Sequence, residues 1–355
     1  MRISDFDFEL PDELIAQHPL GRRDASRMLV VGRAGGQWRD GSFADFASEM
    51  REGDTVVVNN TRVFPARLKG RRAPSGGRVE LLLVRRRESP AGAGEEVWEV
   101  LARPARRLEE GARVTFGDGR LAAEVLSATA GGAGRVVRFQ HEGDFHKLLE
   151  EFGRMPLPPY IKRDSDDLAS VAEDRERYQT VYAAAPGAIA APTAGLHFTP
   201  RVFEELRARG VRVAEVTLHV GYGTFAPVRA DELSGHRVAE ERFEIGEAAA
   251  AEVGATRERG GRVVAVGTTT VRALESAAAG GGRVRPGRGE TGLTITPGYE
   301  FRVVDALLTN FHLPRSSLLV LLSAFAGRDL VLAAYRHAVA ARYRFYSYGD
   351  CMLVV

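Results

Sequence analysis

The local pattern of the chain changes between its first and second halves, and this change constrains the fold more than any other feature. In residues 66–154, short β-prone runs alternate with glycine-rich breaks such as Ser75-Gly76-Gly77 and Gly131-Gly132-Ala133-Gly134. Short strands separated by glycine turns at intervals of about 8–12 residues are typical of a small antiparallel barrel or sandwich. We therefore predict a small antiparallel β-barrel, with strands at residues 78–84, 96–102, 112–116, 121–126 and 135–140.

The second half instead alternates between strand-like and helix-like patterns. Such alternation indicates a layered α/β sheet. A strand candidate at residues 55–59 matches this half better than the barrel. We therefore predict a discontinuous α/β sandwich made of residues 1–65 and 155–355, into which a barrel domain of residues 66–154 is inserted. The strands expected in the second half are 211–220, 262–266 and 303–311, and the helices are 200–210, 247–259, 271–279, 316–326 and 329–341.

Composition excludes several classes of protein. No apolar run approaches the roughly 18 residues of a membrane span, and the N-terminus lacks the basic start and apolar stretch of a signal peptide. We therefore predict a cytoplasmic protein without a membrane partner. Cys351 is the only cysteine, and the eight histidines are scattered. An internal disulfide, an iron–sulfur cluster and a zinc ribbon are excluded, and we expect no metal and no tightly bound cofactor.

Basic residues are concentrated in one stretch, although the formal net charge of the whole chain is only +2. Between Arg62 and Arg87 there are nine basic residues and one acidic residue, Glu80. Such a lane of positive charge is expected of a protein that binds a phosphate backbone. The alternative is a set of solvated surface arginines. The residues we assign to binding of a nucleic-acid backbone are Arg67, Lys69, Arg71 and Arg72.

Polar side chains gather where predicted strands end, which is where open α/β sheets bind ligands. The strand at 55–59 runs into Asn59, Asn60, Thr61 and Arg62. Their amide, hydroxyl and guanidinium groups suit a base edge or a phosphate. An Asx turn followed by a solvated arginine would give the same pattern.

Two further segments combine small residues with a histidine. The first contains Thr193, Gly195 and His197, and the second begins with His219 and continues through Gly221 and Gly223. Small residues let a ligand approach the backbone, and histidine titrates near neutral pH. A histidine in an apolar strand is otherwise a hydrogen-bonded core residue.

A third segment joins a strand to a helix through Gly267-Thr268-Thr269-Thr270, followed by Arg272. Backbone N–H groups and hydroxyls at the start of a helix make a natural site for an anion or a carboxylate. The alternative is capping of the helix by one of the threonines.

Two last segments lie near the C-terminus. One holds Asn310 and His312, and the other holds Tyr348 and Asp350 among several aromatic residues and an arginine. Aromatic rings with an arginine and an acid suit stacking and edge recognition of a base. A tail of this kind also serves to anchor a chain end in the core. A Gly-x-Gly-x-x-Gly motif after a first strand is absent, so a Rossmann dinucleotide site is unsupported.

Together and in this order, the segments resemble one family, the S-adenosylmethionine:tRNA ribosyltransferase-isomerases of queuosine synthesis. The similarity runs from the opening residues 5–11 to residues 343–350. The chain departs from the family pattern at Tyr222 and at residues 238–240 and 293–296. The resemblance implies an α/β sandwich with a small β-barrel, and we expect a monomer.

The resemblance also implies a reaction. S-adenosylmethionine is the ribosyl donor and co-substrate, and the acceptor is a tRNA with 7-aminomethyl-7-deazaguanine at the wobble position. The ribosyl part is transferred and isomerised to give epoxyqueuosine, with release of adenine and methionine. Two rival functions are an S-adenosylmethionine methyltransferase and a non-catalytic RNA-binding module.

Such a reaction needs a base and groups that bind the donor and the modified nucleotide. His197 and His219 are the predicted bases, with Glu241 and Asp350 as the carboxylate candidates. The threonine-rich helix start with Arg272 is expected to hold the methionine carboxylate, and residues 59–62 to read the modified base. The full set of predicted substrate-binding residues is Asn59, Asn60, Thr61, Arg62, Thr193, Gly195, Gly221, Gly223, Gly267, Thr268, Thr269, Thr270, Arg272, Asn310, His312 and Tyr348.

Overall fold

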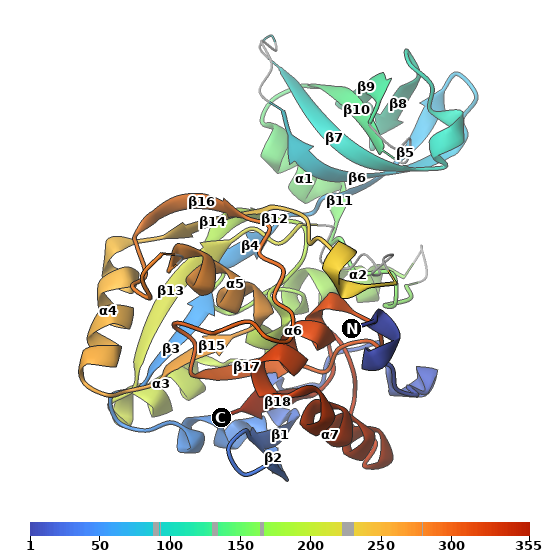
Figure 1. Ribbon diagram of the computed structural model, residues 1–355. Coiled ribbons are helices and arrows are strands. Elements are labelled where there is room, and N and C mark those ends of the chain that lie inside the picture. The colour runs from blue at the N-terminus through green and yellow to red at the C-terminus, as the bar shows by residue number, and fades with distance from the viewer. Residues whose placement is uncertain (88–91, 93, 130–133, 164–166, 222–230, 279) are drawn as a thin grey trace.

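The computed structural model describes residues 1–87, 92, 94–129, 134–163, 167–221, 231–278 and 280–355. A large mixed sheet flanked by helices forms one part, and a closed antiparallel barrel stands at one end of it (Figure 1). The predicted fold class, an α/β sandwich with a small antiparallel β-barrel, is confirmed.

The large sheet is built around four parallel strands. In the middle of it, β13, β3, β15 and β17 lie side by side and run in the same direction. Their carboxyl ends therefore meet at one edge of the sheet, which we call the carboxyl edge. The full strand order is β16 (Gly287–Thr291), β14 (Glu241–Ile245), β13 (Arg212–Leu218), β3 (Thr55–Asn59), β15 (Val263–Val266), β17 (Ala306–Asn310), β18 (Cys351–Val354), β1 (Arg27–Gly32) and β2 (Gln37–Ser42).

Helices cover both faces of the parallel strands, which explains why β3 is apolar throughout. Val56 and Val58 of β3 pack in the same cluster as Leu206 of α3, whereas Val57 faces the cluster that contains Val253 of α4. Strands buried on both faces read as continuous apolar runs. The helices are α1 (Phe145–Phe152), α2 (Leu168–Arg177), α3 (Pro200–Ala208), α4 (Glu247–Glu258), α5 (Thr268–Ala277), α6 (Ser317–Ala326) and α7 (Arg328–Ala340).

The barrel closes because its first strand, β5, pairs with both β6 and β8. Its interior is filled by apolar side chains, among them Leu81, Val100 and Phe139. Gly70 of β5 lets the Phe116 ring lie across the strand, since a Cβ there would be 2.7 Å from that ring. The barrel strands, in spatial order, are β5 (Arg67–Ala73), β6 (Arg78–Arg86), β7 (Glu95–Arg103), β10 (Gly134–His141), β9 (Leu121–Ala128) and β8 (Arg113–Phe116).

Short elements connect the two parts. After the barrel, α1 leads into β11 (Gly153–Arg154), which pairs with β5. In the α/β part, β4 (Thr61–Val63) pairs in parallel with β12 (Ala185–Ala188), and η6 (Thr193–His197) is a single 3₁₀ helix.

All five predicted barrel strands lie between Arg67 and His141. The division into domains at residues 66 and 154 remains a prediction.

Several elements differ from the prediction, among them helices α1 and α2 and strand β1, which were not predicted. The helix expected at 271–279 begins at Thr268, so the three threonines form its first turn and Gly267 precedes it. The strands β2 and β16 were missed because edge strands such as Gln37–Ser42 and Gly287–Thr291 carry mostly polar, exposed residues and show no apolar pattern.

Helices α6 and α7 meet at an angle of 116°. Together they reach the length and apolar composition of a membrane span, whereas no single helix among the described residues does.

Candidate functional site

A cavity of about 630 Å³ opens at the carboxyl edge, beside the ends of β15 and β17. Segments far apart in the sequence line it: residues 159–160, 191–194, 267–269, 309–318 and 346–347, together with Val220. The predicted residues that line the cavity are Thr193, Gly267, Thr268, Thr269, Asn310 and His312.

The start of α5 forms one wall. Gly267 has φ 87°, a conformation that glycine adopts at little cost, and its N–H donates to Leu308 O at 2.8 Å. Thr268 and Thr269 follow in the lining, whereas the Thr270 hydroxyl turns back and donates to Val266 O at 2.7 Å. The first N–H groups of a helix have no partner within it and carry partial positive charge. This wall therefore suits a carboxylate or another anion.

Aromatic rings form a second wall. The ring centroids of Tyr160 and Tyr346 lie 4.0 Å apart, and the Tyr160 hydroxyl is 2.6 Å from Ser347 Oγ. Tyr346 has φ 73° and Arg315 has φ 55°. Both are non-glycine residues in the left-handed region, and both line the cavity. Such strained residues cluster at ligand sites, and an aromatic ring can stack on a heterocycle.

The polar groups after β17 are fixed by hydrogen bonds. His312 Nε2 lies 2.8 Å from Thr309 Oγ1, and its backbone N–H donates to Tyr335 Oη at 3.0 Å. Burial lowers the pKa of His312 to about 3, so the ring is neutral at physiological pH. Asn310 donates its side-chain N–H to Tyr346 O at 2.9 Å. These groups offer oriented hydrogen bonds rather than charge.

His197 lies behind the cavity and is absent from its lining. Its Nδ1 is 2.9 Å from Ser26 Oγ, and its ring packs beside Phe43. Burial lowers the pKa of His197 to about 4, although the nearby Asn310 side chain opposes this shift. Gly195 also faces away, since a Cβ there would lie 2.0 Å from Tyr182 Oη.

A second polar group lies at the ends of β3 and β13. The Asn59 side chain exchanges two hydrogen bonds with the Leu218 backbone, at 2.9 and 3.0 Å, and donates to Thr269 Oγ1 at 3.4 Å. Thr61 Oγ1 is 2.8 Å from His219 Nδ1. Because Thr269 and Val220 line the cavity, this group adjoins it.

His219 is half-buried at the end of β13. Burial lowers its pKa, and the neighbouring Arg242 lowers it further. The ring fits against Gly187, where a Cβ would lie 2.8 Å from it. The four predicted catalytic residues are His197, His219, Glu241 and Asp350. Of these, His219 has both a lowered pKa and a partly exposed side chain, whereas the other three are buried.

Asn60 and Arg62, the other two predicted residues of the segment 59–62, differ from Asn59 and Thr61 in their surroundings. Asn60 donates to Glu215 Oε2 at 3.0 Å and accepts from Thr217 Oγ1 at 2.7 Å. Arg62 on β4 is exposed. Arg62 is therefore the residue of this segment that faces solvent most openly.

Glu241 and Arg272 form a buried ion pair. Glu241 Oε1 also accepts from the Gly221 backbone N–H at 2.8 Å, and Arg272 donates to Thr291 O at 3.0 Å. The pair joins α5 to β14 and β16, and neither residue lines the cavity. Gly223 lies outside the described residues.

The C-terminal candidates hold the chain end in place. Asp350 accepts from the backbone N–H groups of Arg27 and Arg344, both at 2.8 Å. Burial raises its pKa, while these two hydrogen bonds oppose the shift. Tyr348 Oη donates to Asp174 at 2.9 Å. Neither Asp350 nor Tyr348 lines the cavity.

Two of the four basic residues assigned to tRNA binding line a common groove, and the other two do not. Lys69 and Arg71 line a groove of about 510 Å³ on the outside of the barrel. Arg67 donates to Leu157 O at 2.9 Å, and Arg72 donates to Arg107 O at 2.7 Å. Of the four basic residues, Lys69 and Arg71 therefore line a groove, whereas Arg67 and Arg72 contact backbone carbonyls of the protein.

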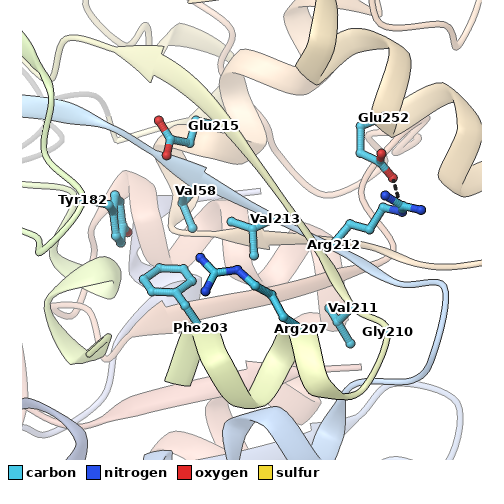
Figure 2. A pocket seen from close by; sticks show the side chains of 10 residues that line it. All are labelled: Val58, Tyr182, Phe203, Arg207, Gly210, Val211, Arg212, Val213, Glu215 and Glu252. Atoms are coloured by element: carbon cyan, nitrogen blue, oxygen red, sulfur yellow. Dashed lines mark ion pairs between the residues drawn. The ribbon is translucent and has the colours of Figure 1, made fainter. Parts of the chain in front are cut away.

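A separate cavity of about 570 Å³ lies between α3 and β13 (Figure 2). Phe203 and Arg207 project into it from α3, Glu215 lies across from them, and Arg212 pairs with Glu252 at 3.6 Å. None of the predicted site residues lines it. Across the described residues, no group of three or more histidine, cysteine, aspartate or glutamate side chains is arranged to hold a metal ion.

Sequence reasoning missed Tyr160, Thr309 and Tyr346 as lining residues. Tyr160 follows the proline-rich stretch 155–159, which was a usable signal of a constrained segment. The positive φ of Tyr346 could not be predicted, because no residue pattern around it indicates a left-handed backbone conformation.

Comparison with known proteins gives consistent results over the full chain. The family described as queuosine biosynthesis protein matches residues 3–354. A curated relative from Pelotomaculum thermopropionicum is 52% identical and one from Symbiobacterium thermophilum is 51% identical, each with full coverage of both chains. Both are named S-adenosylmethionine:tRNA ribosyltransferase-isomerase.

The crystal structure of an S-adenosylmethionine tRNA ribosyltransferase from Thermotoga maritima is also similar. It is 37% identical to this chain, with a TM-score of 0.55, and the match covers 99% of this chain and 100% of that one. The chain is therefore an enzyme of the queuosine biosynthesis protein family, in which these curated relatives are named S-adenosylmethionine:tRNA ribosyltransferase-isomerases.

Proposed function

We propose that this enzyme transfers the ribosyl moiety of S-adenosylmethionine to 7-aminomethyl-7-deazaguanine at the wobble position of a tRNA and isomerises it. The product is epoxyqueuosine-tRNA, and adenine and methionine are released. The observation that carries this proposal is the cavity at the carboxyl edge, where an aromatic wall and a helix start line the same space. The family membership supports it.

The cavity matches the parts of the donor one by one. The aromatic wall of Tyr160 and Tyr346 would stack the adenine. The start of α5, with Gly267, Thr268 and Thr269, would bind the methionine carboxylate. Asn310 and the neutral His312 would hydrogen-bond the ribose, because both side chains are already oriented by neighbours.

The chemistry requires a base near the donor ribose. The positive sulfur acidifies the adjacent ribose carbon, and removal of its proton would give a ylide. Loss of adenine, capture by the nucleoside amine, ring closure and loss of methionine would follow. We assign the proton removal to His219, whose pKa is lowered and whose Nδ1 is engaged by Thr61, which leaves Nε2 available for the substrate proton.

The other predicted catalytic residues take supporting roles in this proposal. His197 would position Asn310 from behind the cavity. Glu241 with Arg272, and Asp350 with the chain end, would hold the surrounding elements in place. Arg62, exposed beside Thr61, would contact the modified nucleotide or its phosphate. We propose no metal and a monomeric enzyme.

The products distinguish this reaction from its rivals. With S-adenosylmethionine and tRNA carrying the aminomethyl base, we expect one adenine and one methionine per turnover on a chromatographic run. A methyltransferase would release S-adenosylhomocysteine and keep the adenine attached, and a non-catalytic RNA-binding module would leave the donor intact. Either of those results would refute the proposal.

A further inference from the structure

The groove on the outside of the barrel collects its positive charge from four strands. Along with Lys69 and Arg71 of β5, it is lined by Arg78 of β6, Arg103 at the end of β7, and Arg154 of β11. Glu80 is its one acidic lining residue. Five cationic side chains around one carboxylate give the groove a strong positive potential.

Strand register explains why these side chains meet. Arg71 of β5 lies directly opposite Arg78 of β6, and Lys69 lies opposite Glu80, which in turn lies opposite Arg103 of β7. Directly opposed side chains stand on the same face of a sheet. The alternate residues Leu68, Val79 and Leu81 point into the barrel core. The cationic side chains therefore project outward together.

The arrangement places two like charges directly opposite each other. Like charges directly opposite each other destabilise an antiparallel pair, yet Arg71 and Arg78 occupy such positions. The carboxylate of Glu80 is already near Arg67 Nε, at 3.8 Å. The side chains of Arg78 and Arg103 are exposed and form no hydrogen bond or ion pair with any described residue. A polyanion would relieve this repulsion.

The groove also lies close along the chain to the cavity. Arg154 lines the groove, and Tyr160, six residues later, lines the cavity. Six residues span at most about 22 Å even when fully extended. Between them, Leu157 O accepts from Arg67 of β5, which fastens this connection to the barrel. One RNA stem-loop is long enough to touch both sites.

We propose that this barrel groove binds the phosphate backbone of the tRNA substrate while the wobble nucleotide occupies the cavity. Arg78, Arg103 and Arg154 join Lys69 and Arg71 as phosphate-binding residues. Arg67 and Arg72 are excluded from direct phosphate contact, because neither lines the groove. The inference rests on the proposed function, since it takes tRNA as the macromolecular substrate.

The test is a salt titration with fluorescently labelled, unmodified tRNA and the full-length enzyme. The double variant Arg78→Ala/Arg103→Ala should raise the Kd for tRNA about tenfold or more and reduce the slope of log Kd against log salt by roughly 1.5 to 2. In turnover assays it should raise KM for tRNA and leave kcat and KM for S-adenosylmethionine unchanged. Arg78→Lys/Arg103→Lys should retain the wild-type slope.

The matched control is Arg85→Ala/Arg86→Ala, which removes two exposed arginines from the opposite end of β6. It should leave the Kd and the salt slope at wild-type values. Wild-type affinity and slope in the groove variant, or an equal loss in the control, would overturn the groove proposal. A wild-type enzyme that releases no adenine with modified tRNA would instead refute the proposed reaction, so the two failures are distinguishable.

Discussion

Hydrogen-bond partners decide which polar side chains at the carboxyl edge are free to meet a substrate. Asn59 and Asn60 are adjacent, yet both side chains are engaged within the protein, by Leu218 for Asn59 and by Glu215 and Thr217 for Asn60. Those partners lie about 155 residues further along the chain. The sequence therefore predicted the segment correctly as a strand end, but it could not indicate the direction of each side chain.

At the residue scale, His219 is the assigned base. Replacing His219 by alanine should lower kcat about a hundredfold, the usual scale for a general base, and change the Kd for S-adenosylmethionine little. Because burial lowers the pKa of His219, the neutral form should persist below the ordinary value of about 6.5 for histidine. Activity should therefore stay constant down to that pH and fall only below it.

Steady-state kinetics across pH provide the check, together with calorimetric titration of the donor. The control is His146→Ala, which changes an exposed histidine on α1 and should behave like wild type. A wild-type kcat in the His219→Ala variant would show that His219 is not the base.

The Glu241–Arg272 pair has a structural consequence that can be measured without substrate. Glu241→Ala would leave the buried Arg272 guanidinium without its carboxylate, which should lower the free energy of unfolding by about 3–5 kcal/mol. Glu244→Ala removes the partner of Arg288 in an exposed pair on the same strand, and should cost at most about 1 kcal/mol. Urea denaturation followed by circular dichroism measures both. Equal losses in the two variants would contradict the assigned role.

At the element scale, several strands and helices were predicted, whereas the edge strands, β1 and the helices α1 and α2 were missed. The apolar pattern of β3 and the helical periodicity of α3, α4, α6 and α7 gave boundaries within a few residues of those observed. In contrast, β18 pairs with β17 and β1 through only four buried residues. So short an apolar run at a chain end carries too little pattern to be distinguished from a buried tail.

The sequence predicted an anion site at the start of α5, but it could not show which of the three threonine hydroxyls face the cavity. Thr269 lines the cavity, whereas the next residue, Thr270, bonds back to Val266. Thr269→Val should weaken S-adenosylmethionine binding about fivefold to tenfold, the scale of one lost hydrogen bond. Thr270→Val, which removes an equivalent hydroxyl, should leave the Kd for the donor unchanged.

Isothermal titration calorimetry with S-adenosylmethionine distinguishes the two threonines. Loss of affinity only in Thr270→Val, or in neither variant, would move the carboxylate site away from this helix start.

At the scale of the whole molecule, the insertion of a barrel into an α/β chain was visible in the sequence because the two parts have different periodicities. The meeting of distant segments around one cavity was not visible, since Tyr160, Val220 and Tyr346 come together only through the topology of the sheet. Likewise, the basic lane of the sequence contributes only part of the groove, to which Arg103 and Arg154 come from β7 and β11.

The measurement that tests the central claim most directly follows the ribose carbons of the donor. S-adenosylmethionine labelled in the ribose is incubated with the enzyme and with two tRNAs, one carrying the aminomethyl base and one with unmodified guanine at the wobble position. We predict that label enters only the tRNA with the aminomethyl base, because unmodified guanine has no amine there to attack. Label in both tRNAs equally, or in neither, would contradict the proposed ribosyl transfer.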